Sequence, residues 1–285
     1  MAISPTTHTN WARTKWSLNV LAARETPRLI TSRINDRSSE VTGEPMQVLN
    51  IPEVSTLVTY AIGDNGEVTP QTPPGTNQTL TIDQKRECTL VFTDDYKFQI
   101  AVKESTQAAM QGRALKDFME AYVLSLETGL SGTSVRDIAG SLTDAELVLL
   151  VQIGVTNNWP STNRHIMVSA GGMGSILGIS EFKDAQFIGD GNLPMTTGKL
   201  KAVYGFEPLT SSVVRRRSIS NVTRTVNMAW IGKDAGGGAF CKGVQKDVSV
   251  KMQEEDLAHK IISWNMFGAT LARNDHAYAM RTTAA

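Results

Sequence analysis

The stretch TDDYKFQIAVKESTQAAMQGRALKDFMEAYVLSLETG, residues 93–129, decides how the rest of the chain must be arranged. It contains no proline, and Thr93 followed by Asp94 and Asp95 has the composition of a helix N-terminus. Gly129 stands where a left-handed residue commonly ends a helix. At about 1.5 Å per residue we expect one helix of about 50 Å, well beyond the usual length of about 11–12 residues. Such a helix needs an extended architecture to support it.

The predicted helix carries an apolar stripe with spacings of three and four residues. The stripe consists of Phe98, Val102, Ala109, Leu115, Met119, Tyr122 and Leu126, so its bulk lies in the C-terminal half. The middle is small, with Ser105, Ala108 and Gly112, and a mid-helix glycine costs about 1 kcal/mol relative to alanine. We expect either a close approach by another segment there, such as a neighbouring backbone, or a solvated middle.

The composition of the 285 residues is that of an ordinary globular protein, with 41% hydrophobic and 20% charged residues. The 28 basic and 28 acidic residues balance, which argues against an overall electrostatic attraction to nucleic acid or anionic membrane. We expect neither a transmembrane helix nor a secretion signal, because no sufficiently long apolar run is present. Cys88 and Cys241 are too few for a disulfide framework, so we expect free thiols in a reducing cytosol.

Residues 1–47 are polar and mixed in charge, with Trp11 and Trp16 as the prominent apolar side chains. This favours an arm laid on another surface, and partial disorder is the alternative. Residues 47–62 and 80–92 have the pattern of two strands, joined by an exposed turn over 63–79 that is dense in Gly, Pro, Asn and Thr. Because an isolated hairpin is marginally stable in water, we expect it to lean on something, such as a partner subunit.

After the long helix the pattern becomes that of a compact α/β region. Thr143 and Glu146 predict a capping box for a helix that ends near residues 154–157. The further expected elements are a loop at 131–140, a strand at 164–170, a helix at 171–179, a loop at 180–194, two strands around Gly205 within 200–214, a linker at 235–239, and strands within 222–230, 244–252 and 261–280, the last with a turn at Asn274 and Asp275.

The sequence offers little catalytic chemistry. The histidines His8, His165, His259 and His276 are scattered, and none has a second His or Cys at metal-ligand spacing. The GGMG at 171–174 lacks the spacing of a dinucleotide fingerprint and predicts a strand-to-helix turn. Arg215, Arg216 and Arg217 form the one dense basic run, which fits a phosphate contact, a solvated loop or a subunit contact. We predict no catalytic, cofactor-binding or metal-ligating residues and no enzymatic activity.

The order of these pieces resembles the major capsid proteins of tailed bacteriophages, which have the Hong Kong 97 fold. Residues 80–126 resemble the return strand of that family's extended loop running into its spine helix. Residues 163–177 and 198–214 resemble strand and helix pieces of its axial domain, and 262–280 the closing strands of its peripheral domain. The resemblance covers most of residues 45–283, and the order and spacing carry more weight than any single motif.

The resemblance implies an α+β fold with five parts. These are an N-terminal arm (1–46), an extended β-hairpin loop (47–92), a long spine helix with part of the peripheral domain (93–140), an axial domain (141–236), and closing strands of the peripheral domain (237–285). It also implies a structural protein that self-assembles into an icosahedral virion shell around double-stranded DNA, in the cytoplasm of a host bacterium. The implied partners are further copies in hexamers and pentamers, a scaffolding protein, a portal protein, a decoration protein as a further candidate, and non-specifically held DNA, with no membrane and no cofactor.

The distribution of charged residues predicts which segments of two copies would lie near each other. Residues 47–83 contain no Lys or Arg and carry Glu53, Asp64, Glu67 and Asp83, so we expect this loop to lie near basic groups of another copy. Such groups on the arm and helix are Arg13, Lys15, Arg24, Lys97, Lys103, Arg113 and Lys116. Since the loop has no lysine, we expect no loop lysine–asparagine crosslink of the kind some family members form. The candidate self-association residues are Trp11, Trp16, Glu53, Asp64, Glu67, Pro73, Pro74, Lys103, Arg113, Lys116, Asp190, Arg215 and Arg216.

Three alternatives remain open at this point. The first is an encapsulin-like cellular nanocompartment shell that encloses a cargo enzyme. The second is a soluble enzyme with a site near Arg164, His165 and Asp190, which lacks a convergent nucleophile, base or metal set. The third is a nucleic-acid-binding module that uses Arg215, Arg216 and Arg217, against which net charge and the lack of interleaved aromatics count.

Overall fold

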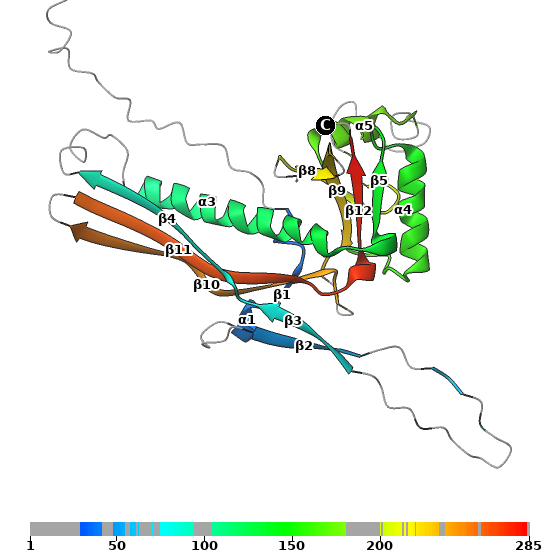
Figure 1. The fold of residues 1–285 in the computed structure, drawn as a ribbon, viewed down its shortest axis with the longest axis horizontal. Helices are drawn as coiled ribbons and strands as arrows, with labels where there is room; N and C mark the ends of the chain where they lie inside the picture. The colour runs from blue at the N-terminus through cyan, green and yellow to red at the C-terminus, as the bar shows by residue number, and fades with distance from the viewer. Residues whose placement is uncertain are drawn as a thin grey trace, which may run out of the picture.

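The computed structural model describes residues 29–41, 48–54, 58–60, 62, 70, 75–93, 104–180, 200, 202–212, 214, 216–219, 221–233, 237–255 and 258–283. These residues form a compact sheet, an elongated sheet and a separate two-stranded ribbon (Figure 1). The fold is therefore mixed α and β, as expected from the sequence.

The compact sheet has six strands, five of them in the order β5-β12-β9-β6-β7, with β8 paired to β9. Their bounds are β5 Val135–Ile138, β6 Arg164–Val168, β7 Glu207–Thr210, β8 Arg216–Ile219, β9 Val222–Ile231 and β12 Ala277–Thr282. Two helices belong to this region, α4 (Asp144–Thr156) and α5 (Ala170–Gly178). Buried clusters lie on both faces of the sheet, one containing Trp230 and the other Ile166 and Leu150. The central strand β9 is consequently buried without alternation over its last seven residues.

The elongated sheet has the order β1-β10-β11-β4, and the helix α3 lies along it (Figure 1). The bounds are β1 Asn35–Asp36, β4 Gln84–Thr93, β10 Phe240–Glu255, β11 Ala258–Leu271 and α3 Glu104–Ser125. Along β11, Ile261, Ser263 and Phe267 are at most 1% exposed. Gln111 of α3 donates to the Ile261 carbonyl (3.1 Å) and accepts from Ser263 Oγ (2.6 Å), which identifies this as the face beneath the helix.

The ribbon consists of β2 (Val48–Val54) and β3 (Gly75–Thr81), preceded by the short helix α1 (Ser38–Val41). A small cluster of Val41, Leu80 and Ile82 anchors it. At Gly268 of β11, a Cβ atom would lie 2.0 Å from the Thr81 carbonyl oxygen, so only glycine permits the ribbon backbone to approach this closely. From this anchor the ribbon passes the base of the compact region, where Glu53 and Gln78 lie near Asn157 and Arg273 (Figure 1).

The C-terminal end of the long helix differs from expectation. At the other end, Thr93 is the last residue of β4 and pairs with Ala258 of β11, and the predicted helix start falls on residues 94–103, which lie outside the described residues. The described helix begins at Glu104 and has 22 residues, about 33 Å at about 1.5 Å each. At the C-terminal end a 3₁₀ turn, η2 (Leu126–Gly129), follows directly, and Gly129 is not among the glycines with positive φ. The helix therefore tightens into 3₁₀ geometry instead of ending in a left-handed glycine.

The apolar stripe of the helix is confirmed from Leu115 onward, whereas Ala109 is exposed. Leu115 and Met119 are 3% and 7% exposed, and Tyr122 and Leu126 pack on the core. Phe98 and Val102 lie outside the described residues. At Gly112, the segment that approaches is a side chain rather than a backbone, since an added Cβ would meet Val248 Cγ1 at 3.5 Å.

Three further expectations are wrong for reasons of long-range pairing. The single return strand at 80–92 is divided, because β3 pairs with β2 while β4 pairs with β11, and the expected turn is shortened by β3, which begins at Gly75. The expected loop at 131–140 contains β5, which needs its distant parallel partner β12 to form. Thr143 is the N-cap of α4 but makes no side-chain cap, and Glu146 pairs with Arg136 at 2.9 Å instead of closing a capping box.

Two more expected strands are shorter or missing. Before Gly205 there is only an isolated bridge between Val203 and Phe206, so β7 is the one strand formed among the described residues there, and the strand expected at 47–62 ends at Val54, since residues 58–60 and 62 are not in a strand.

Several other expected elements are confirmed. The strand at 164–170 is β6, the helix at 171–179 is α5, and the C-terminal pair is β11 and β12 joined through η4 (Asn274–His276). The kink at Gly205 is a turn in which Tyr204 and Gly205 both have positive φ, at 47° and 82°. Most of the expected loop at 180–194 and residues 235 and 236 of the linker lie outside the described residues.

Candidate assembly surfaces

A buried carboxylate on α3 fixes the segment that precedes β1. Glu120, 1% exposed, accepts hydrogen bonds from the backbone N–H groups of Leu29 (2.6 Å), Ile30 (2.6 Å) and Thr31 (3.0 Å). The Thr31 hydroxyl donates a fourth at 2.7 Å. Four donors around one carboxylate compensate its burial, since hydrogen bonds to a charged group are the strong ones. The chain that leads from the N-terminal residues is thus clamped to the long helix.

A second polar cluster ties the same segment to the compact sheet. Arg33 donates to both carboxylate oxygens of Glu207, at 2.8 and 3.2 Å, and His165 Nδ1 lies 2.8 Å from Glu207. Hydrogen bonding from Arg33 lowers the pKa of Glu207, although partial burial opposes this. Burial lowers the pKa of His165 despite the opposing charge of Glu207. The cluster is a structural joint between two parts of the chain.

The described residues that were candidates for an enzyme site make structural contacts within the chain. Arg164 donates to the carbonyl oxygens of Pro160 (2.6 Å) and Trp159 (2.7 Å), and its guanidinium lies over the Phe206 ring. His165 belongs to the joint just described, and Asp190 lies outside the described residues. Within the part of the chain that the structure describes, no three His, Cys, Asp or Glu side chains converge as metal ligands would.

The basic run at 215–217 is partly built into the fold. Arg216 and Arg217 begin β8 rather than lying in a loop, and Arg216 is exposed. Arg217 pairs with Glu127 at 3.4 Å, and Arg281 pairs with the same carboxylate at 3.1 Å. Glu127 is fully buried, so Arg217 neutralises an internal charge and is not available as a free phosphate contact. Arg215 lies outside the described residues.

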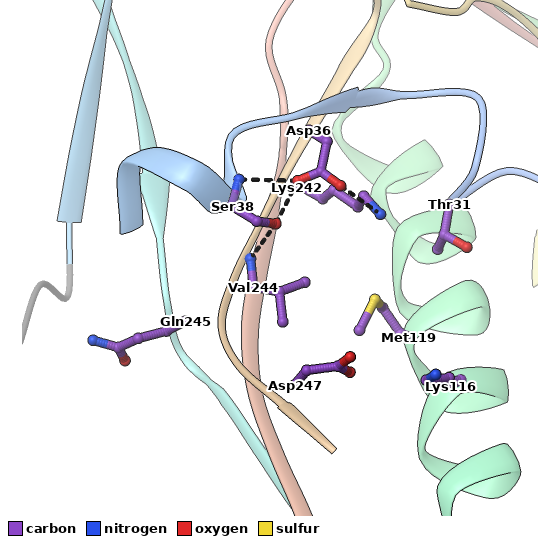
Figure 2. A pocket seen from close by; sticks show the side chains of 9 residues that line it. All are labelled: Thr31, Asp36, Ser38, Lys116, Met119, Lys242, Val244, Gln245 and Asp247. Atoms are coloured by element: carbon purple, nitrogen blue, oxygen red, sulfur yellow. Dashed lines mark hydrogen bonds and ion pairs between the residues drawn. The ribbon is translucent and has the colours of Figure 1, made fainter. Parts of the chain in front are cut away.

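A groove of about 390 Å³ lies where α3, β10 and the β1–α1 segment meet (Figure 2). Lys116 and Met119 enter it from the helix, and Asp36 pairs with Lys242 at 3.0 Å. Burial would raise the pKa of Asp36, but hydrogen bonds from Ser38 and the nearby Lys242 lower it overall. With Asp247 opposite Lys116, the groove holds both signs of charge and selects neither a cation nor an anion.

The face of the elongated sheet away from α3 is basic and partly apolar. On this face, strand β11 presents Met266, Trp264 and Ile262, each of which lies between a paired residue of β4 and a paired residue of β10. The flanking side chains include Lys85 and Lys246, whose ammonium groups lie 5.8 and 5.2 Å from the Trp264 ring centroid. We call this surface the basic sheet face, defined by Lys85, Lys246, Lys251, Lys260, Ile262, Trp264 and Met266, with Glu87 among them. Because these apolar side chains are only half-buried, the face is suited to a partner that is apolar and acidic.

The acidic segment at 47–83 exposes apolar side chains as well. Val58, Tyr60 and Ile62 are 60%, 56% and 71% exposed and are spaced two residues apart. Glu53 lies 3.6 Å from Arg273 and accepts weakly from Gln78 Nε2 at 3.5 Å, so its nearest basic partner here belongs to its own chain. A third exposed apolar region lies on α4, where Val155 is 67% exposed beside Val148 and Tyr204.

The structure describes four of the residues predicted for self-association. Arg113 and Lys116 lie on α3, Glu53 on β2 and Arg216 on β8, so they do not form a single cluster. The others lie outside the described residues: Trp11, Trp16, Asp64, Glu67, Pro73, Pro74, Lys103, Asp190 and Arg215. The sequence analysis missed Glu120. The available signal was an acidic residue directly after Met119, which belongs to the apolar stripe. The basic sheet face was missed as well, since it requires the pairing register of three distant strands.

No helix in the described part of the chain is both long and apolar enough to cross a membrane. No family model and no curated protein matches the sequence. Solved structures do match it. A chain titled "Acidic stable capsid structure of Helicobacter pylori bacteriophage KHP30" aligns with a TM-score of 0.76 at 9% identity, covering 99% of this chain and 98% of that chain.

A chain titled "Capsid structure of the Cyanophage P-SCSP1u" aligns with a TM-score of 0.74 at 15% identity, covering 97% of this chain and 94% of that one. A chain from Mycobacterium phage Che8 aligns with a TM-score of 0.74 at 16% identity, covering 95% and 97%. At these identities the likeness concerns the fold. The chain has, over nearly its whole length, the fold found in these phage capsid structures.

Proposed function

We propose that this chain is a major capsid protein that self-assembles into the icosahedral head shell enclosing the double-stranded DNA of a tailed bacteriophage. The observation that carries this proposal is the full-length fold match to phage capsid chains, with 97–99% of this chain covered in the two structures titled as capsids. The role is structural. The polar clusters described above support it, because each of them holds segments of the chain together.

We further propose the detailed division of the Hong Kong 97 fold. In it, residues 1–46 are the arm, 47–92 the extended loop, 93–140 and 237–285 the peripheral domain with α3 as part of the spine helix, and 141–236 the axial domain. The elongated sheet with α3 and the projecting ribbon support this division. Within it, β12 pairs with β9 of the axial part and β5 pairs with β12, so the two domains share the compact sheet.

Charge supports contact between copies through the extended loop. Residues 47–83 carry four acids and no Lys or Arg, whereas the basic sheet face presents Lys85, Lys246, Lys251 and Lys260. We propose that the acidic loop of one copy lies near this face of another. Exposed ion pairs contribute only about 0–1 kcal/mol each, so the effect depends on repetition over many copies.

The remaining partners follow from the same proposal. They are a scaffolding protein, a portal protein, a decoration protein as a further candidate, and packaged DNA bound without sequence specificity, with assembly in the host bacterial cytoplasm. The formal net charge of zero supports this, because a container must hold DNA without binding it tightly.

Electron microscopy of the purified chain, expressed alone and with its genomic neighbours, tests the proposal. We expect closed polyhedral particles, spirals or tubes. A uniform monomer or dimer under every condition would contradict a shell-forming role. Nucleic acid inside the particles would distinguish a phage head from a nanocompartment that holds a cargo enzyme.

Charge reversal tests the contact itself. The double variant Lys246→Glu and Lys251→Glu is expected to lower the particle yield at low salt. Because both side chains are exposed, the free energy of unfolding of the free subunit should stay within about 0.5 kcal/mol of the wild-type value. Adding Asp64→Lys and Glu67→Lys is expected to restore the yield. Lys233→Glu, on an exposed turn elsewhere, is the control. An unchanged yield for the β10 double variant at both low and high salt would contradict the proposed contact.

A further inference from the structure

The face of β11 beneath α3 contains a short run of polar side chains. Ser263 and Asn265 are both 0% exposed there. Gln111 of α3 satisfies Ser263, since its amide oxygen accepts from Ser263 Oγ (2.6 Å) while its nitrogen donates to the Ile261 carbonyl (3.1 Å). Asn265 differs, because neither its amide nitrogen nor its amide oxygen has a hydrogen-bond partner among the described residues. A buried amide without partners is costly, so this group requires an explanation.

The charged neighbour of Asn265 is engaged elsewhere. Arg86 of β4 is the residue paired with Asn265 in the sheet. Its guanidinium lies over the Phe118 ring, 4.3 Å from the centroid, and donates to Gln84 at 3.1 Å. The Asn265 amide is therefore not neutralised by a charge from β4.

Strand β10 has a bulge directly opposite Asn265. The pairing of β10 with β11 shifts register between Lys246 and Ser249, so that Asp247 and Val248 both stand opposite the single residue Asn265. The Val248 N–H donates to the Asp247 side chain (2.8 Å) rather than across to β11. Because a bulge leaves one residue unpaired and disrupts the ladder, backbone polar groups outside the regular pairing lie across from the Asn265 amide.

The helix leaves room at the same point. Gln111 lies over Ser263, and α3 runs along β11 in the same direction, so the next turn of the helix crosses Asn265. This turn contains Gly112, where an added Cβ atom would meet Val248 Cγ1 at 3.5 Å as its one contact across the interface among the described residues. A site bounded by an amide, a bulge and a glycine is polar and has space, the two conditions for a buried water molecule.

We propose that Asn265 binds a buried water molecule that connects its amide to the backbone of the β10 bulge. An asparagine amide and backbone groups offer both donors and acceptors, so the matching ligand is small, neutral and able to donate and accept. Water in this position takes the place of the ladder bonds that the bulge interrupts, and joins β10 to β11 beneath α3. The site lies within one chain, so it does not depend on the proposed self-assembly.

A second buried asparagine provides a matched control. Asn227 of β9 is also 0% exposed, but its amide oxygen accepts from the Ser169 N–H (3.1 Å) and its nitrogen donates to Thr282 Oγ1 (3.1 Å). Asn227 and Asn265 share residue type and burial and differ in their partners. Direct protein contacts satisfy Asn227, whereas Asn265 requires a ligand.

High-resolution structure determination of the wild-type chain tests the site, by electron microscopy of particles or by crystallography of the free subunit. We expect a density peak within about 3.2 Å of the Asn265 amide and of a backbone polar atom of residue 247 or 248, with no such peak beside the Asn227 amide. The inference is overturned if the Asn265 amide bonds directly to protein groups. It is also overturned if the site shows no peak in a map that resolves buried water elsewhere in the chain.

Substitution gives an independent measurement. Asn265→Leu would displace the water and leave the groups of the bulge unpaired, so we expect a lower unfolding temperature than that of the wild type. If the amide were simply unpaired, the same change would remove an unsatisfied group and raise the unfolding temperature, which would contradict the proposal. Asn227→Leu should lower the unfolding temperature in either case. If Asn265→Leu does not fold, the wild-type density decides.

Discussion

The compact sheet and the elongated sheet differ in how their central strands are buried. In the compact sheet, β9 has buried residues on both faces, and Met228, Ala229 and Trp230 are at most 1% exposed in succession. In the elongated sheet, β11 alternates between buried residues beneath α3 and half-exposed residues on the basic sheet face. The compact region completes its own core, whereas the described residues of the elongated region leave the basic sheet face half-exposed.

Two tryptophans make the sharpest test of this difference. Trp230→Ala removes a fully buried side chain of the compact core, and we expect a loss of about 3–5 kcal/mol in the free energy of unfolding, measured by chemical denaturation. Trp264→Ala, on the basic sheet face, is expected to cost the free subunit much less and to lower the particle yield instead. Equal losses of subunit stability would show that the two sheets do not differ in this way.

The clamp at Glu120 tests whether the two regions depend on the same N-terminal segment. Glu120→Gln replaces the charged acceptor of four hydrogen bonds, and we expect a loss of about 3 kcal/mol, since hydrogen bonds to charged groups contribute about 1.5–3 kcal/mol each. Hydrogen exchange should show faster exchange of the Leu29 and Ile30 amides. Asp117→Asn, on the same helix, is the control. Unchanged exchange at Leu29 and Ile30 would argue against the clamp.

The smallest expected effect concerns pH and the joint at His165. Burial lowers the pKa of His165, so the folded state favours the neutral ring and binds fewer protons than the unfolded chain. Stability is therefore fully present above the unfolded pKa of about 6.5 and decreases as the pH falls through that value. We expect His165→Gln to flatten this dependence between about pH 7 and 5, measured by thermal unfolding. The lowered pKa values of Asp36 and Glu207 act in the same direction at lower pH, below about 4. A wild-type unfolding temperature that rises on acidification would contradict the sign.

Sequence patterns were informative where the structure depends on local signals. The helix α5 and the strand β6 were predicted near their observed bounds, because the polar NNWPST turn precedes the strand and the helix follows it directly. Leu115 and Met119 were identified as buried from helical spacing alone. The overall resemblance to a capsid fold was likewise available from the order of elements.

Sequence patterns failed where the structure of a segment depends on pairing with a segment far away in the sequence. The single return strand expected at 80–92 is divided, because β3 pairs with β2 whereas β4 pairs with β11. The four residues of β5 become a strand through β12, which is more than a hundred positions away. The basic sheet face combines lysines from β4, β10 and β11, and only the register of three strands places them around Trp264. These features are products of topology, which periodicity does not reveal.

The absence of basic residues in the projecting ribbon has a consequence for proteolysis. Between Arg37 and Lys85 the sequence offers no bond to a trypsin-like protease, although this stretch includes the exposed Val58, Tyr60 and Ile62. The first such bonds beyond it follow Lys85 and Arg86, on a strand of the basic sheet face. Free subunits exposed to such a protease would thus be cut beside the surface that receives a neighbour, and never within the segment that reaches for one.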